Sequence, residues 1–185
     1  MTPSADHLEG DFIENTISVV VCHYTTVSGK IECLHAKEFS APTLEHCLGS
    51  INIPKAKTAS LSQLKVVEGG LYLGEVHSLE LPNLEQGKWD IFALKAVNFI
   101  APKLKKVGGD LLANSATRFC APKLSVVKHS LNTGETNPRL KNLTEAQEVL
   151  TKAGCFPNWL AWYNHQTLIE ELSQKVLIPN EELTL

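Results

Sequence analysis

Side chains that could do chemistry are scattered along this chain rather than grouped at short spacing. Its seven histidines show neither an HxxxH nor an HExxH pattern, so no pair is placed to hold a metal ion. Ser60, Ser62 and Ser78 lack the G-x-S-x-G context of a nucleophile elbow. Gly69-Gly70 and Gly108-Gly109 are not followed by Lys-Ser or Lys-Thr, as a phosphate-binding loop would be. We therefore predict no enzyme activity, no metal site and no cofactor.

The cysteines are also dispersed. They number five and lie at Cys22, Cys33, Cys47, Cys120 and Cys155. An odd number without a CxxC pair is typical of reduced, mostly buried thiols in a cytosolic protein, and not of a disulfide scaffold or a zinc site. Residues 1–11 are polar and acidic, without the basic and apolar regions of a signal peptide. No apolar run approaches the roughly 18 residues that cross a membrane. We expect a cytoplasmic protein that does not enter the membrane.

The overall composition is that of a globular protein with a mildly acidic surface. The chain has 185 residues, of which 43% are hydrophobic, and a formal net charge of −3. Non-specific nucleic-acid binding needs a strongly basic face, so a nucleic-acid partner is not expected.

A repeat of twenty residues runs from about Ile31 to Leu131 and organises the chain. Branched aliphatic residues recur at every twentieth position, at Ile31, Ile51, Leu71, Ile91, Leu111 and Leu131. A second column follows thirteen residues later without exception, at Leu44, Leu64, Leu84, Leu104 and Leu124. A fixed period of this size is typical of stacked units, each of which buries its apolar residues against its neighbours.

Other columns predict how each coil turns and what fills its interior. A column of large apolar residues contains one small exception, Ala59, and consists of Phe39, Ala59, Leu79, Phe99 and Phe119. Valine or cysteine closes most coils at a position where Gly87 is the single gap. Glycines for which we expect positive φ lead into the following strands, at Gly29, Gly49, Gly69 and Gly109. Trp89 and His129 interrupt this glycine column.

These columns predict a mainly β protein. We expect a right-handed parallel β-solenoid of about six twenty-residue coils, closed by a C-terminal α-helical cap. Residues 1–18 would form an N-terminal cap or lead-in, residues 19–133 the solenoid, and residues 134–185 the helical cap and tail.

The end of the chain has helical signals. Residues 132–138 are rich in turn formers. Thr144, with Gln147 three residues later, is a capping-box pattern, and it starts a predicted helix that would stop before Gly154. The apolar stripe of that helix would be Leu143, Ala146, Val149 and Leu150. The aromatic segment 156–163 would cover the open end of the solenoid or, alternatively, bind a partner. A further short helix is expected over 166–175.

The run APKLKKVGGDL, from Ala101 to Leu111, resembles the leucine-rich-repeat-like units of receptor L domains and of BspA-type bacterial proteins. The resemblance covers roughly residues 19–133. The Asn that follows the LxxLxL strand of the standard leucine-rich repeat is absent, which favours a flatter β-solenoid. A coil of twenty residues is also similar to that of pentapeptide-repeat proteins, although their A-(D/N)-L-x-x signature is missing. Both resemblances imply a binding protein rather than an enzyme.

The outward-facing positions of the predicted strands contain candidate binding residues. Tyr72, Phe92 and Leu112 share one outward column, and strands stacked about 4.8 Å apart would make them an apolar ladder. Such a patch marks a partner site, unless the C-terminal helices fold back over it. Trp89 and Asp90, on the Phe92 coil, break the regular pattern and are a second candidate.

Two adjacent coils also carry a cluster of lysines. This basic patch consists of Lys103, Lys105, Lys106, Lys123 and Lys128. A cluster of this kind is most often a solvated face, and the second interpretation is that it steers an acidic partner.

We expect, from these features together, a non-enzymatic protein-binding module. Its size would suit a small bacterial or phage inhibitor, of the toxin-immunity or anti-defence type, that binds a protein target through the sheet face. A self-assembling structural module, such as a homodimer through the solenoid face or edge, is the first alternative. An enzyme with a cryptic site near residues 89–110 is the second.

Overall fold

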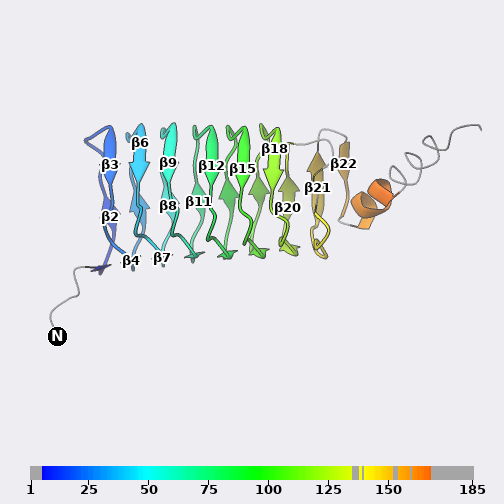
Figure 1. Ribbon diagram of the computed structural model, residues 1–185, viewed down its shortest axis with the longest axis horizontal. Helices are drawn as coiled ribbons and strands as arrows, with labels where there is room; N and C mark the ends of the chain where they lie inside the picture. The colour runs from blue at the N-terminus through cyan, green and yellow to red at the C-terminus, as the bar shows by residue number, and fades with distance from the viewer. Residues whose placement is uncertain (1–5, 135–137, 139, 152–153, 159, 168–185) are drawn as a thin grey trace, which may run out of the picture.

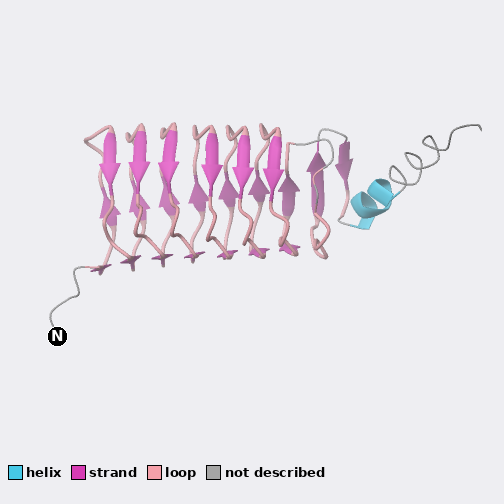
Figure 2. Ribbon diagram, viewed as in Figure 1, coloured by secondary structure: helices cyan, strands magenta, loops and turns pink. Residues whose placement is uncertain are grey.

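A computed structural model describes residues 6–134, 138, 140–151, 154–158 and 160–167. The chain winds into a parallel β-solenoid of about seven turns, and most turns add one short strand to each of three faces (Figure 1). Figure 2 shows the strands stacked along one axis, with a helix at the C-terminal end. The expected fold is therefore confirmed. It has about one turn more than predicted, because β1 (His7–Leu8) and β2 (Phe12–Ile13) already belong to the stack.

The first face is a seven-stranded parallel sheet in the order β1-β4-β7-β10-β13-β16-β19. After β1, its strands are β4 (Thr26–Val27), β7 (His46–Cys47), β10 (Val66–Val67), β13 (Gln86–Gly87), β16 (Lys106–Val107) and β19 (Val126–Val127). Residues twenty apart in sequence lie opposite one another, as Val66 does to Gln86. The sequence period is thus the strand register.

The second face is a nine-stranded sheet in the order β2-β5-β8-β11-β14-β17-β20-β21-β22. After β2 come β5 (Ile31–Glu32), β8 (Ile51–Asn52), β11 (Leu71–Tyr72), β14 (Ile91–Phe92), β17 (Leu111–Leu112), β20 (Ser130–Asn132), β21 (Glu148–Thr151) and β22 (Gly154–Phe156). Every neighbouring pair is parallel except β21 with β22, which is antiparallel. The parallel stacking therefore ends at β21.

The third face is divided into two separate three-stranded sheets. One contains β3 (Val19–Val21), β6 (Glu38–Ser40) and β9 (Thr58–Ser60), and the other contains β12 (Ser78–Glu80), β15 (Asn98–Ile100) and β18 (Arg118–Cys120). The other two faces continue without a break across the same coils, since β10 pairs with β13 and β11 with β14. The split is thus confined to one side of the solenoid.

The interior is filled by the apolar columns that the sequence predicts. Both aliphatic columns, together with Phe39, Leu79, Phe99 and Phe119, are buried in one continuous core. The rings of Phe99 and Phe119 stack with centroids 4.9 Å apart and planes 7° apart, as neighbours in the register of β15 and β18. Each coil therefore buries its side chains mainly against the coils before and after it.

The glycine column has a different cause from the one predicted. Positive φ occurs in the described residues only at Gly10, Gly134 and Gly154, so the expected positive φ of Gly29, Gly49, Gly69 and Gly109 is wrong. These four glycines instead lie against the preceding coil. A Cβ on Gly49 would stand 2.5 Å from the Gly29 carbonyl oxygen, and a Cβ on Gly109 would stand 2.0 Å from the Asp90 carboxylate. Glycine is needed at these positions because there is no room for a side chain between the coils.

The helix predicted to start at Thr144 is wrong. Residues 148–151 form β21, which extends the parallel stack on β20, and Thr144 donates its backbone N–H to the Ser125 carbonyl. The apolar residues Leu140, Leu143, Ala146 and Val149 are buried in the solenoid core. Their spacing of three also occurs within the regular coils, where Ala121, Leu124 and Val127 are buried at the same interval. Helical and solenoid patterns coincide over such a short segment, and tertiary stacking decides between them.

A helix does form over residues 160–167, and its first half lies in the predicted aromatic segment 156–163. The side-chain Oδ1 of Asn158 accepts the backbone N–H of Ala161, as an N-cap does. Trp162 is buried and belongs to the core, whereas Leu160 and Tyr163 are exposed. Trp162 thus supports the capping role predicted for the segment. The second helix expected over 166–175 lies mostly outside the described residues, of which 166 and 167 end the observed helix.

The five thiols are free, as the sequence predicts. Cys22, Cys33 and Cys47 are buried, and burial raises the pKa of both Cys33 and Cys47 to about 11. In the part of the chain that the structure describes, no helix is long and apolar enough to cross a membrane.

Candidate functional site

The predicted apolar ladder is present on the second face. β11, β14 and β17 are in direct register there, so that Tyr72 lies opposite Phe92 and Phe92 opposite Leu112. The Tyr72 and Phe92 rings meet edge to face, with centroids 5.4 Å apart and planes 72° apart. All three side chains are partly exposed, whereas their strand neighbours Leu71, Ile91 and Leu111 are buried. Alternation along each strand therefore sends one side chain inward and the next outward.

A glycine makes room for the Tyr72 ring. A Cβ on Gly70 would lie 2.3 Å from Cζ of Tyr72, so the ring lies over the Gly70 backbone. Partial burial, together with the neighbouring Asp90 carboxylate, raises the pKa of the Tyr72 hydroxyl. The phenol is therefore neutral at physiological pH, and the ladder presents two packed aromatic rings and a leucine without a charge among them.

Polar residues bound the ladder at both ends of the register. Asn52 lies opposite Tyr72 in β8, and Asn132 lies opposite Leu112 in β20. The C-terminal helix 160–167 stands beyond β22, at the end of the stack, and the ladder strands lie several coils away from it (Figure 1). The described helix thus leaves the ladder uncovered, and three consecutive coils present a compact apolar strip.

The second predicted candidate, Trp89 with Asp90, precedes β14 at the corner between the first and second faces. The side chain of Trp89 is 62% exposed, the highest value among the large hydrophobic residues described. Glycines at this position in other coils form backbone hydrogen bonds between coils, as Gly69 N–H does with the Gly49 carbonyl at 3.1 Å. Trp89 forms no such backbone hydrogen bond with any described residue. Trp89 thus replaces a backbone contact with an exposed indole.

Asp90 has a structural role at this corner. Its Oδ1 accepts the backbone N–H of Asp110 at 2.9 Å, and Oδ1 of Asp110 accepts the N–H of Ser130 at 2.8 Å. Ser50 Oγ accepts the N–H of Gly70 at 3.0 Å in the same way. These short polar side chains satisfy backbone donors between successive coils. Ser50, Asp90, Asp110 and Ser130 occupy one column of the twenty-residue repeat, in which Gly70 is the exception, and this pattern of short polar residues could have revealed their role.

The five lysines of the basic patch lie elsewhere, on β16 and on the bends that flank the first face. Three of them bond to a neighbouring coil: Lys103 Nζ to Asn83 Oδ1 at 2.7 Å, Lys105 Nζ to Glu85 Oε2 at 2.7 Å, and Lys128 Nζ to Glu145 Oε1 at 2.8 Å. The structure therefore does not bring the patch together with the ladder. Its charge is also partly neutralised, which supports the interpretation as a solvated face.

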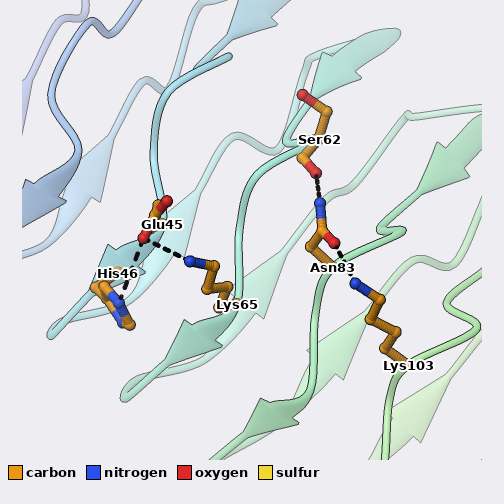
Figure 3. Close-up of polar contacts among 6 residues, drawn as sticks. All are labelled: Glu45, His46, Ser62, Lys65, Asn83 and Lys103. Atoms are coloured by element: carbon orange, nitrogen blue, oxygen red, sulfur yellow. Dashed lines mark hydrogen bonds and ion pairs between the residues drawn. The ribbon is translucent and has the colours of Figure 1, made fainter.

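These contacts belong to a set of polar side-chain interactions between neighbouring coils. Figure 3 shows Lys65 donating to Oε2 of Glu45 at 2.7 Å, and Asn83 donating to the Ser62 carbonyl at 2.8 Å while it accepts from Lys103. Hydrogen bonds from the lysines are the main cause of the lowered pKa of Glu45 and of Glu85. Charges of alternating sign along a column favour the in-register stacking of coils.

The described residues contain no group of three or more His, Cys, Asp or Glu side chains that could hold a metal ion. Comparison of the chain with protein-family models, with curated proteins and with solved structures finds no match. The parallel β-solenoid is thus established by the structure itself, and the resemblances to leucine-rich-repeat-like and pentapeptide-repeat proteins stay predictions from the sequence.

Proposed function

We propose that this chain is a non-enzymatic protein-binding module that engages its partner through the ladder of Tyr72, Phe92 and Leu112. The observation that carries the proposal is the apolar strip on three coils in register, which is bounded by Asn52 and Asn132 and which the described helix leaves uncovered. Apolar strips with polar borders on an otherwise solvated face are typical of protein interfaces. Tyrosine and tryptophan are also the residues that most often dominate binding energy, and Trp89 lies on the Phe92 coil.

The rigidity of the scaffold supports the same proposal. Backbone hydrogen bonds of 2.8–3.0 Å lock successive coils of the second face together at the ladder, from Leu71 N–H to the Asp90 carbonyl and from Ala93 N–H to the Leu112 carbonyl. A preformed surface loses little conformational entropy on binding. A compact binder of this kind suits a small bacterial or phage inhibitor, of the toxin-immunity or anti-defence type, and this is the role we propose. Its five free thiols suit a reducing compartment such as the cytoplasm.

The test is quantitative affinity purification from the host, followed by measurement of the dissociation constant for the recovered partner. The double variant Tyr72→Ser/Phe92→Ser should weaken binding by about a hundredfold or more, because it removes two adjacent anchor side chains. The control is Leu94→Ser/Val97→Ser, which removes two exposed apolar side chains of the Phe92 coil outside the second face. Equal binding by the ladder variant and by its control would rule out the ladder as the site.

A specific observation favours self-assembly as the second candidate. The strands β1, β2 and β3 are terminal in their sheets, and β3 consists of three valines of which Val19 and Val21 are exposed. An apolar edge strand is a template for pairing with another chain. Light scattering tests this alternative: a dimer that becomes a monomer in Val19→Lys/Val21→Lys would establish edge pairing, and a wild-type monomer at high concentration would exclude it.

A further inference from the structure

The third face opens between β9 and β12, and Figure 1 shows these two strands standing further apart than their neighbours. In each coil after the first, a backbone hydrogen bond to the preceding coil lies just before the strand of the third face. At the split this bond, from His77 N–H to the Lys57 carbonyl, measures 3.4 Å. The equivalent bonds of the other coils measure 2.7–2.8 Å: Lys37 to Ser18, Lys57 to Lys37, Val97 to His77, and Thr117 to Val97. The bond at the split is thus the longest of those that precede the strands of the third face.

A second backbone hydrogen bond between coils lies directly after the strand of the third face, and it is absent at the split. In the other coils it is 2.8–2.9 Å long and joins Cys22 to Ser40, Ala41 to Ser60, Leu81 to Ile100, and Ala101 to Cys120. The corresponding donor, the backbone N–H of Leu61, has no hydrogen-bond partner among the described residues, although the side chain of Leu61 is buried. A backbone donor without a partner at a buried position is rare and indicates a site that another molecule can occupy.

Ala59 explains why the opening forms at this coil. It is the one small member of the inward column that otherwise carries Phe39, Leu79, Phe99 and Phe119, all of which are buried. Ala59 itself is partly exposed, so solvent reaches the inner layer where a ring or a leucine is missing. The space left at Ala59 corresponds to the difference between an alanine and the larger side chain that the other coils carry there.

Two adjoining hollows follow the split and share Ala59, Ser60 and Ser78 in their linings. The larger measures about 380 Å³ and includes Phe39 in its lining; the smaller measures about 290 Å³ and includes Leu61. Glu38 and Lys57 give the larger hollow charges of opposite sign, and Glu80 adds one carboxylate to the lining of the smaller. A neutral ligand suits such a lining, since apolar floors with a few convergent polar groups are typical of small-molecule sites.

We propose that the split between β9 and β12 binds a small neutral aromatic molecule that bears a hydroxyl or carbonyl oxygen. Its ring lies against Ala59, in the place where the other coils carry an apolar side chain. Its oxygen accepts the unpaired N–H of Leu61, while Ser60 and Ser78, which are exposed and alternate with the inward residues of β9 and β12, line the outer part of the opening. This site lies on a different face from the Tyr72 ladder and does not depend on the proposed protein partner.

The test is a titration of isotope-labelled protein with p-cresol, followed by the chemical shifts of its backbone amides. Saturable shifts are expected at Ala59, Leu61 and Ser78. Ala59→Phe should restore the column and weaken binding by at least about tenfold, because the ring of the new side chain fills the vacancy. Ala59→Leu, which introduces the side chain that the next coil carries at Leu79, tests the same point if the phenylalanine variant does not fold. Leu94→Phe, which introduces the same ring at an exposed position outside both the split and the ladder, is the matched control and should bind p-cresol as the wild type does.

Two further measurements separate the apolar part of the site from its polar part. Toluene, which lacks the oxygen, should bind at least about tenfold more weakly than p-cresol. In hydrogen exchange, the Leu61 amide should exchange faster than those of Ala41 and Leu81 and should become protected when p-cresol binds. The proposal is overturned if the wild type shows no saturable shifts, if both Ala59 variants bind like the wild type, if toluene binds as tightly as p-cresol, or if Leu61 is already protected without ligand.

Discussion

Replacement of Gly49 by alanine tests the inference that close contact between coils, and not positive φ, requires the glycine column. The new Cβ would lie 2.5 Å from the Gly29 carbonyl oxygen and 2.6 Å from the Lys30 nitrogen. Ordinary contacts between such atoms need roughly 3.5 Å, so the two coils would have to separate by about 1 Å at this corner. That movement would break the bond from Gly49 N–H to the Gly29 carbonyl, which measures 3.0 Å.

The cost can be estimated from these two effects. Loss of one backbone hydrogen bond removes about 0.5–1.5 kcal/mol, and overpacking against a rigid backbone costs about 1–3 kcal/mol. Gly49→Ala should therefore lower the free energy of unfolding by about 2–4 kcal/mol. In urea, with a slope of about 2 kcal/mol per molar, the midpoint should fall by about 1–2 M.

Gly87→Ala is the matched control, since both substitutions add one methyl group and restrict the unfolded chain to the same extent. A Cβ on Gly87 meets the Ile91 side chain, with Cδ1 at 3.0 Å and Cγ1 at 3.2 Å, and the nearest backbone atom outside the adjoining residues is the Trp89 carbonyl oxygen, at an ordinary contact distance of 3.8 Å. Its effect on the free energy of unfolding should stay within about 1 kcal/mol. Urea denaturation followed by circular dichroism measures both variants, and equal midpoints for the two would refute the reasoning.

Three other predictions follow from the core and the surface. Phe99→Ala should lower the free energy of unfolding by about 3–5 kcal/mol, because it opens a cavity in a buried column; the shift of the urea midpoint measures this. Glu85 has a lowered pKa in the folded protein through its bond to Lys105, so its stabilising contribution is present above the unfolded pKa of about 4.3 and is lost as the pH falls through the folded value. In Lys105→Met, an NMR titration should find the pKa of Glu85 higher than in the wild type, and an unchanged value would contradict the assigned cause. Cys33 and Cys47 have pKa values raised to about 11 by burial, so iodoacetamide at pH 8 should modify them only when urea is present, and labelling of the native protein, mapped by mass spectrometry, would contradict their burial.

The two errors in the sequence prediction have a common physical origin. Gly49 was assigned positive φ because a glycine at a bend often adopts it, and Thr144 was assigned a helix start because its pattern is that of a capping box. Both assignments rest on residues close together in the chain. The structure places Gly49 against the coil twenty residues earlier and bonds Thr144 to Ser125. In both places, contacts with the preceding coil, about twenty residues earlier in the chain, outweigh the conformational preference of the local sequence.

The candidate site also has a part that the sequence predicts and a part that it does not. The twenty-residue period places Tyr72, Phe92 and Leu112 in one outward column, and the register of β11, β14 and β17 confirms that arrangement. Sequence reasoning grouped Asp90 with Trp89 as a second candidate, but the distance from Asp90 to the Asp110 N–H shows a structural role. Ala59 is an evident exception in its column, but the sequence does not predict the split between β9 and β12. Whether the face opens depends on how far the neighbouring coils can close around the smaller side chain.

The period, the buried columns and the outward ladder of this protein can all be predicted from the spacing of its residues. A strict repeat makes residue i and residue i + 20 equivalent, so register and burial follow from the spacing alone. The places where the repeat is imperfect become clear only in the folded chain: residues 140–151 continue the stack, and β9 and β12 part at Ala59. These outcomes depend on the balance between backbone pairing and side-chain packing across neighbouring coils, which is a property of their three-dimensional contacts and not of any one segment.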